Sequence, residues 1–540
     1  MKRRVILGIA LGLLVGCSDA SPTDPPGPAP DPDPVQPVDP ADYLDRPLRD
    51  QVDVVEAGLL SCVGLTTGYL DRIAERDDGD DGIGAVLALA PDPRAVAEAL
   101  ADKAGTGARL TCANVLLKDN IDSAGMATTA GSIAMVDNLV DEDAPVARRL
   151  RDASALLLGK TNLSEWANFR GVGSTSGWSS LGGQTHNGAA PAYNPCGSSS
   201  GSAAAVAAGL ASAAIGTETD GSITCPAAVN GVVGFKPTVG LVSRTGIVPI
   251  SRSQDTAGPI TRTVGDAARL LSVMAGPDPA DPATAAIPVD LNLDFEASLG
   301  SADFDGARIG VITNLVTSAE VVMAFEAELA MLESAGAILV DVTLPTSAAY
   351  GQAELTVLTT ELKVDLGAYL ASHSQPGQPT TLAELIAFNA ANAATVMPHF
   401  GQELFELAET TSGLDDPAYL AALADSRRIT GEEGIDAVML ADDLDLLISP
   451  TTGPAWKTDY ANGDSITGVA GGPAAVAGYP HLTVPMGTLD VATAEGFDAL
   501  ALGMSFMAGR WQDSAVLDYG HAYEQLKQAD PAGEGGQPDP

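Results

Sequence analysis

The chain has 540 residues and is strongly acidic, with 70 aspartates and glutamates against 28 lysines and arginines and a formal net charge of −42. A surface of this charge repels phosphate backbones and leaves no basic stripe, which excludes nucleic acid as a partner. Neither Cys-x-x-Cys nor His-Glu-x-x-His occurs, so the sequence predicts no metal site and no cofactor.

The first 16 residues have the pattern of a bacterial lipoprotein signal peptide. A basic start is followed by the apolar run Val5 to Val15 and by Leu-Val-Gly directly before Cys17. The apolar run is too short to span a bilayer as a helix. We therefore expect export and a lipid on Cys17, which would anchor the protein to the cell envelope on its periplasmic or outer side.

The segment 17–43 is rich in proline and aspartate and carries too little bulky apolar surface to fold, which predicts an extended tether. The tail 530–540 is similarly polar and is predicted to be disordered. No comparable linker interrupts residues 44–529, so we expect one large domain there. Its oligomeric state is not predicted.

Helical and strand patterns alternate along this domain. Apolar spacing over 44–75 suits amphipathic helices, residues 109–120 have a strand pattern, and short apolar runs at 309–312 and 444–449 alternate with helical segments. This alternation predicts an α/β fold.

The block 194–237 places two serine-bearing turns on either side of an apolar run, 203–215, that only Ser212 interrupts. Such a run must be buried, so the turns are not flexible linkers. Glycines at 197, 201 and 221 permit the positive φ angles that expose a neighbouring hydroxyl or a fan of backbone N–H groups. This arrangement suits acyl transfer.

One alternative interprets Gly197 to Gly201 as the Gly-x-Ser-x-Gly elbow of an α/β-hydrolase, with Ser199 as the nucleophile. That elbow requires a buried strand directly before it. Two prolines and an asparagine in APAYNPC argue against such a strand.

Several segments carry a family resemblance. GSSSGSA, GTETDGSI and CPAAVNGVVGFKPT lie in this block, VLLKDN and then LGKTNLSE precede it, and GYPHLTVPMG lies near the end of the chain. Together they resemble the amidase signature family of Ser-Ser-Lys hydrolases. The segments SEWANFRG, PCGSSSGS and LVSRTGIVPIS are most similar to its bacterial peptide amidases, which remove the C-terminal carboxamide of peptides. The resemblance covers most of the chain and implies a mixed, largely parallel central sheet flanked by helices.

The resemblance implies that Ser222 is the nucleophile, that Ser198 relays its proton, and that Lys118 is the base. Lys160 also follows an apolar run, but the resemblance places it in a structural motif. A lysine must be neutral to accept a proton, and burial favours the neutral amine.

Successive N–H groups in the turn formed by Thr219, Asp220, Gly221 and Ser222 predict an oxyanion hole, and Pro226 suggests a helix just beyond. Many family members have glycine where Asp220 stands and arginine where Thr224 stands. Peptide amidases resemble this chain at Asp220.

We expect the substrate to be a small peptide amide or another amide, and Trp166, Phe169 and Trp178 to be candidate walls of its cleft. Two alternatives stay open: a broader amide or ester hydrolase of the same family, and a catalytically silent binding lipoprotein. The cytoplasmic aminoacyl-tRNA amidotransferases fit an exported chain poorly.

Four cysteines remain if Cys17 carries lipid, and three pairings are possible. Cys196 and Cys225 lie in segments that resemble peptide amidases, whereas Cys62 and Cys112 lie where the chain departs from the family. We predict a Cys62–Cys112 disulfide.

Overall fold

The computed structural model describes residues 38–79, 81–493 and 496–529. The predicted signal peptide, Cys17, most of the predicted tether and the tail 530–540 lie outside these residues. The fold already includes residue 38, whose N–H donates to the Leu59 carbonyl, and the 3₁₀ helix η1 (Pro40–Tyr43) follows. The folded region therefore begins before residue 44.

Among the described residues, eleven strands form one sheet in the order β1-β3-β2-β6-β8-β7-β12-β13-β11-β9-β10. Parallel pairs lie toward the two ends of this order, in β3-β2-β6 and in β11-β9-β10, and antiparallel pairs lie between them and at β1. The strand bounds are β1 (Val86–Leu89), β2 (Asn114–Lys118), β3 (Leu156–Thr161), β6 (Ala213–Glu218), β7 (Val233–Lys236), β8 (Thr256–Thr261), β9 (Arg308–Ile312), β10 (Ile338–Val342), β11 (Leu446–Pro450), β12 (His481–Thr493) and β13 (Gly496–Met507), with a separate pair β4 (Trp178–Ser179) and β5 (Gly183–Gln184).

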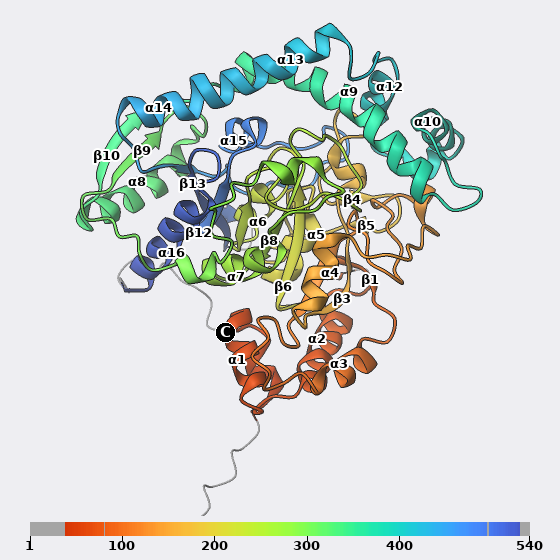
Figure 1. Ribbon diagram of the computed structural model, residues 1–540, viewed down its shortest axis with the longest axis horizontal. Coiled ribbons are helices and arrows are strands. Elements are labelled where there is room, and N and C mark those ends of the chain that lie inside the picture. Colours follow the sequence, from red (N-terminus) through yellow and green to blue (C-terminus); the bar gives the residue numbers. More distant parts are fainter. Residues whose placement is uncertain (1–37, 80, 494–495, 530–540) are drawn as a thin grey trace, which may run out of the picture. The chain divides into compact units, whose positions relative to one another are not determined.

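Helices flank the sheet, so the expected α/β fold with a mixed central sheet is confirmed (Figure 1). Their bounds are α1 (Leu48–Glu56), α2 (Cys62–Arg76), α3 (Pro93–Ala101), α4 (Pro145–Asp152), α5 (Ser200–Ala207), α6 (Thr224–Val229), α7 (Val264–Met274), α8 (Ala319–Ser334), α9 (Ser347–His373), α10 (Leu382–Ala391), α11 (Ala393–Val396), α12 (Glu403–Glu409), α13 (Pro417–Arg427), α14 (Asp436–Ala441), α15 (Gly472–Ala477) and α16 (Asp513–Ala529). The remaining short helices are η2 (Ile133–Met135), η3 (Glu165–Asn168), η4 (Pro282–Ala286), η5 (Glu296–Ser298) and the π-helix η6 (Arg428–Ile435).

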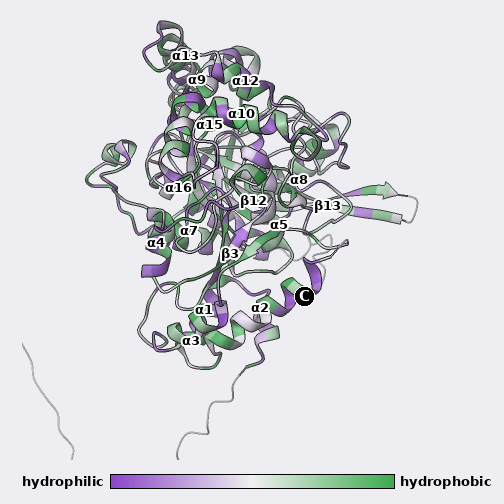
Figure 2. Cartoon of the chain, turned by 90° about the vertical axis from the view of Figure 1, so that its right-hand side faces the viewer, coloured by the Kyte–Doolittle hydropathy of each residue, from purple (hydrophilic) through white to green (hydrophobic). Residues whose placement is uncertain are grey.

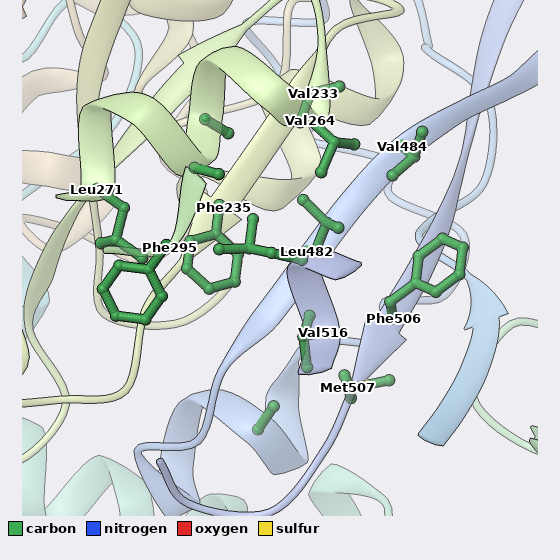
Figure 3. Close-up of a cluster of buried hydrophobic side chains, with 14 of the residues drawn as sticks. Val233, Phe235, Val264, Leu271, Phe295, Leu482, Val484, Phe506, Met507 and Val516 are labelled. Atoms are coloured by element: carbon green, nitrogen blue, oxygen red, sulfur yellow. The ribbon is translucent and has the colours of Figure 1, made fainter. Parts of the chain in front are cut away.

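The main core packs helices α7 and α16 against the middle of the sheet. Figure 3 shows side chains of β7, α7, β12, β13 and α16 meeting there, together with Phe295 from directly before η5, all with little or no exposure: Val233, Phe235, Val264, Leu271, Phe295, Leu482, Val484, Phe506, Met507 and Val516. The outer part of the β12–β13 hairpin extends away from this core and carries polar as well as apolar residues (Figure 2). In the parts of the chain described, no helix combines the length and the apolar character needed to cross a membrane.

The predicted pairing of Cys62 and Cys112 is confirmed, with their Cα atoms 5.3 Å apart. This disulfide joins the start of α2 to the loop before β2. A second disulfide joins Cys196 to Cys225, whose Cα atoms are 6.0 Å apart. Cys196 lies two residues before Ser198 and Cys225 three residues after Ser222, so this bond ties the two serine turns together.

Candidate active site

A cleft of about 660 Å³ opens beside Ser222. The turn 219–222 and the disulfide form one side of it, and a face of helix α9 forms another. A larger cavity of about 860 Å³ adjoins the cleft at Ala167, Thr219 and Ile250, but Ser222 does not line it. The smaller cleft is therefore the one that can hold a group reacting at Ser222.

Lys118 is the last residue of β2, a strand buried between β3 and β6, and its side chain is fully buried. Its Nζ lies 2.7 Å from Ser198 Oγ, 3.1 Å from Ser199 Oγ and 3.1 Å from the Thr217 carbonyl oxygen. A neutral amine has two N–H donors and one lone pair, so these three contacts allow it to donate twice and accept one O–H.

Burial lowers the pKa of Lys118 from 10.5 to about 7, and the negative charges of Glu218 and Asp255 oppose this shift only in part. An ammonium loses its hydration in this position, and no carboxylate lies within ion-pair distance of Nζ among the described residues to compensate. A substantial fraction of Lys118 is therefore neutral at physiological pH.

Lys118 contacts Ser198 and Ser199, whereas the Ser222 side chain makes no hydrogen bond to Lys118 or Ser198 within the described chain. The three serines also differ in their access to the cleft. Ser198 and Ser199 are fully buried, and the peptide bond between Gly197 and Ser198 is cis. Ser222 keeps 8% of its surface exposed and lines the cleft. The Ser199 N–H donates to the Ser222 carbonyl at 3.1 Å, which holds the two turns together. Because Ser199 is enclosed and no strand precedes it, the elbow interpretation is not supported.

The turn before α6 presents unused backbone donors to the cleft. Within the described chain, the N–H groups of Asp220, Gly221 and Ser222 have no hydrogen-bond acceptor, and all three residues line the cleft together with Thr219. Gly221 has a φ of +77°, a conformation that an L side chain would strain. Free N–H groups on successive residues of a turn can form an anion-binding nest.

Glu218 shapes this turn and was missed by the sequence analysis. Its carboxylate accepts the N–H of Ile223 at 2.7 Å and the N–H of Thr224 at 3.0 Å, which leaves the N–H groups of the nest free for a ligand. The sequence feature that could have pointed to Glu218 is its position as an acidic residue four positions before Ser222. Helix α6 begins at Thr224 and includes Pro226 in its first turn, close to the predicted start.

Lys160 lies in the neighbouring strand β3 but has a different environment. Its Nζ pairs with Asp119 at 3.3 Å and donates to the carbonyl oxygens of Ile121 at 2.7 Å and Ala127 at 3.0 Å. These contacts hold the loop after β2 in place, and Lys160 does not line the cleft. Its position fits the structural role that was expected.

The aromatic walls of the cleft differ from the prediction. Phe169 lines the cleft, but Trp166 packs edge-on against Phe405 in a core cluster and Trp178 packs against Phe400. Both tryptophans are buried. Gly197 and Gly201 also differ from the expectation, because neither has a positive φ. A Cβ at Gly197 would overlap Ser164 Oγ, and one at Gly201, in α5, would overlap the backbone oxygens of Ala85 and Asn162, so close packing requires glycine at both positions.

Comparison with known proteins extends the resemblance. A family model described as amidase matches residues 65–517. The X-ray structure of native peptide amidase from Stenotrophomonas maltophilia is 48% identical, with a TM-score of 0.85, over 90% of this chain and 98% of that one. A probable amidase of Arabidopsis thaliana is 35% identical over 424 residues, 76% of each chain. The A subunit of the glutamyl-tRNA(Gln) amidotransferase of Natronomonas pharaonis is 39% identical over 349 residues, 62% of this chain and 78% of its own. The chain therefore belongs to the amidase signature family, as an amide-hydrolysing enzyme similar to peptide amidase.

Proposed function

We propose that this enzyme hydrolyses the C-terminal carboxamide of peptides to carboxylate and ammonia through Ser222, Ser198 and Lys118. The observation that carries the proposal is the position of Lys118 Nζ, 2.7 Å from Ser198 Oγ in a fully buried site, together with the opening of Ser222 onto the cleft. The 48% identity to a peptide amidase supports the choice of substrate.

In this mechanism neutral Lys118 accepts the Ser198 proton while Ser198 takes the proton of Ser222. The Ser222 oxygen attacks the carboxamide carbon, and the resulting oxyanion accepts hydrogen bonds from the N–H groups of the nest at 219–222. The C–N bond then breaks, and the relay returns a proton to the departing nitrogen, which leaves as ammonia. Water cleaves the acyl-enzyme ester through the same relay and regenerates the Ser222 hydroxyl.

Preference for a carboxamide over an internal peptide bond requires a cleft that is closed beyond the scissile nitrogen, because both bonds are amides. The burial of the neighbouring serines and the disulfide beside Ser222 support a closed end there. A closed end on that side would exclude a peptide that continues past the scissile bond.

The test uses one peptide in two forms, with a C-terminal carboxamide and with a free acid. Incubation of the carboxamide should release ammonia and add about one dalton, the difference between NH₂ and OH, while the internal bonds survive. The free acid should be unchanged. Cleavage of internal bonds, or activity confined to simple acyl amides and esters, would favour the broader hydrolase, and inactivity on all of these would favour the binding lipoprotein.

We further propose that the mature chain begins at a lipidated Cys17 and is exported and anchored to the cell envelope. The support is the sequence alone, namely the leader and the Leu-Val-Gly-Cys box. A labelled fatty acid should enter the wild-type protein and not the Cys17→Ser variant. Labelling of that variant, or partition of the wild-type protein into the aqueous phase of a detergent separation, would contradict the anchor.

A further inference from the structure

Three oxygen-bearing side chains gather at one part of the cleft. Asp220 lies two residues before Ser222, whereas Tyr350 and Glu354 lie one turn apart on helix α9, and all three line the cleft. A Cβ added to Gly472 would overlap the Tyr350 hydroxyl and lie 4.0 Å from Asp220 Oδ1, so these two side chains converge on the same point.

Helix α9 presents a continuous face to this cleft. Its lining residues recur at spacings of three and four, as expected for one side of a helix: Ser347, Tyr350, Gly351, Glu354, Leu355 and Leu358. The polar members lie toward the start of α9 and the leucines follow. A bound peptide therefore meets both an oxygen-rich part and an apolar part of the same helix.

The Tyr350 hydroxyl lacks a partner. Only 4% of this residue is exposed, and its hydroxyl makes no hydrogen bond to any residue that the structure describes. The hydroxyl oxygen is not among the buried side-chain atoms that lack a partner in the described chain, so it is accessible from the cleft that Tyr350 lines. The hydroxyl can therefore accept a hydrogen bond from a ligand in the cleft or donate one to it, and the two neighbouring carboxylates favour a ligand that donates.

The two carboxylates lack a cation. Within the described part of the chain, neither forms an ion pair with a lysine, arginine or histidine, and Glu354 accepts only from the neutral amide of Gln254, at 3.0 Å. Glu354 is 9% exposed. Asp220 is exposed in the cleft. Desolvation, followed by the charges of Glu354 and Glu218, raises the pKa of Asp220 well above the usual value, and the charge of Lys236, which forms no ion pair with Asp220, opposes this shift only in part. Burial raises the pKa of Glu354 as well.

We propose that Asp220, Tyr350 and Glu354 bind a primary ammonium group of the substrate, an inference that rests on the proposed hydrolysis of peptide amides. An ammonium has three N–H donors, one for each of the three side chains, and supplies the positive charge that the carboxylates lack. A neutral amide N–H₂ offers only two donors and no positive charge, so it fits these three side chains less well. The ammonium is either the N-terminus of a short peptide amide or a lysine side chain.

The test compares four dipeptide amides by kcat/KM. Alanyl-phenylalanine amide is compared with its N-acetyl derivative, and N-acetyl-lysyl-phenylalanine amide with N-acetyl-norleucyl-phenylalanine amide. Each pair differs in one ammonium. We expect the charged member of at least one pair to be preferred about 10- to 100-fold, the range for a hydrogen bond involving a charged group, with the difference mainly in KM. The pair that shows the preference identifies the source of the ammonium.

Variants test the residues involved. Glu354→Gln keeps the shape of the side chain and should bring the preferred ratio close to one, and Tyr350→Phe should reduce it less. Glu326→Gln removes an equal charge from an exposed position on α8 outside the cleft and should leave the ratio unchanged. Circular dichroism melting curves establish that each variant is folded.

Equal kcat/KM within both pairs for the wild-type enzyme would overturn the inference even if no variant folds, and the proposed function would stand because carboxamides are still hydrolysed. An unchanged ratio in folded Glu354→Gln would overturn it too. Failure to release ammonia from any of the four substrates would refute the proposed function and the inference with it.

Discussion

The protonation state of Lys118 gives the sharpest kinetic prediction. Burial lowers its pKa from 10.5 to about 7, and only the neutral amine can accept the serine proton. Activity should therefore rise with pH and reach half of its plateau near pH 7. At pH 5 about 1% of Lys118 is neutral, so kcat/KM should lie about 100-fold below the plateau. Ammonia release measured from pH 5 to 9 at low substrate concentration gives this profile.

A variant links the acid limb of the profile to Lys118. Glu218 raises the pKa of Lys118 by its charge, and Glu218→Gln removes that charge while keeping an oxygen that can accept the N–H groups of Ile223 and Thr224. The acid limb should move to lower pH. Glu326→Gln, exposed on α8, should leave it in place. A profile that is flat between pH 5 and 8, or a limb that does not move in Glu218→Gln, would refute the assignment of Lys118 as the base.

Three further predictions concern stability. Lys118→Met should abolish turnover yet stabilise the fold at pH 7 by at most about 5 kcal/mol, because the unfolded chain keeps the lysine proton up to pH 10.5 and the folded chain only to about 7. This gain in the free energy of unfolding should shrink as pH rises between those values, and denaturant titrations that show a gain independent of pH would contradict the prediction. Replacing Cys62 and Cys112 by serine should lower the free energy of unfolding by about 4 kcal/mol, since the disulfide closes a loop with a sequence separation of 50. Non-reducing peptide maps that show both cysteines of the wild-type protein as free thiols would contradict this prediction. Lys160→Met should lower the free energy of unfolding by about 3–5 kcal/mol, because it leaves Asp119 unpaired. The folded fraction should keep its reactivity toward an electrophilic serine probe, and selective loss of that reactivity would assign Lys160 a catalytic role.

Local sequence features predicted much of the fold. The spacing of apolar residues indicated the first two helices, and the runs at 309–312 and 444–449 became β9 and β11. Their signal was strong because buried strands and amphipathic helices place apolar residues at fixed intervals. The long antiparallel hairpin β12–β13 was not predicted, because its outer residues face solvent and their apolar pattern is weak.

Within the site, the residues found from the sequence lie in contiguous motifs, as Lys118, Ser198 and Ser222 do. Tyr350 and Glu354 were missed because they lie more than a hundred residues further along the chain, in an ordinary helical pattern, and reach the cleft only through packing of α9. Trp166 and Trp178 were candidates for the cleft because large aromatics serve equally well in cores and in binding sites. Their burial in the core follows from tertiary packing that a sequence does not display.

The most direct test of the central claim is labelling with an electrophilic serine probe, followed by mass spectrometry of the tryptic peptides. We expect one adduct, on Ser222, which Ser222→Ala should abolish together with turnover. Labelling and turnover should be slowed by at least about 100-fold in Lys118→Ala and in Ser198→Ala, with no further loss when these two changes are combined. An adduct on Ser199, or full labelling and turnover in folded Lys118→Ala, would contradict the central claim.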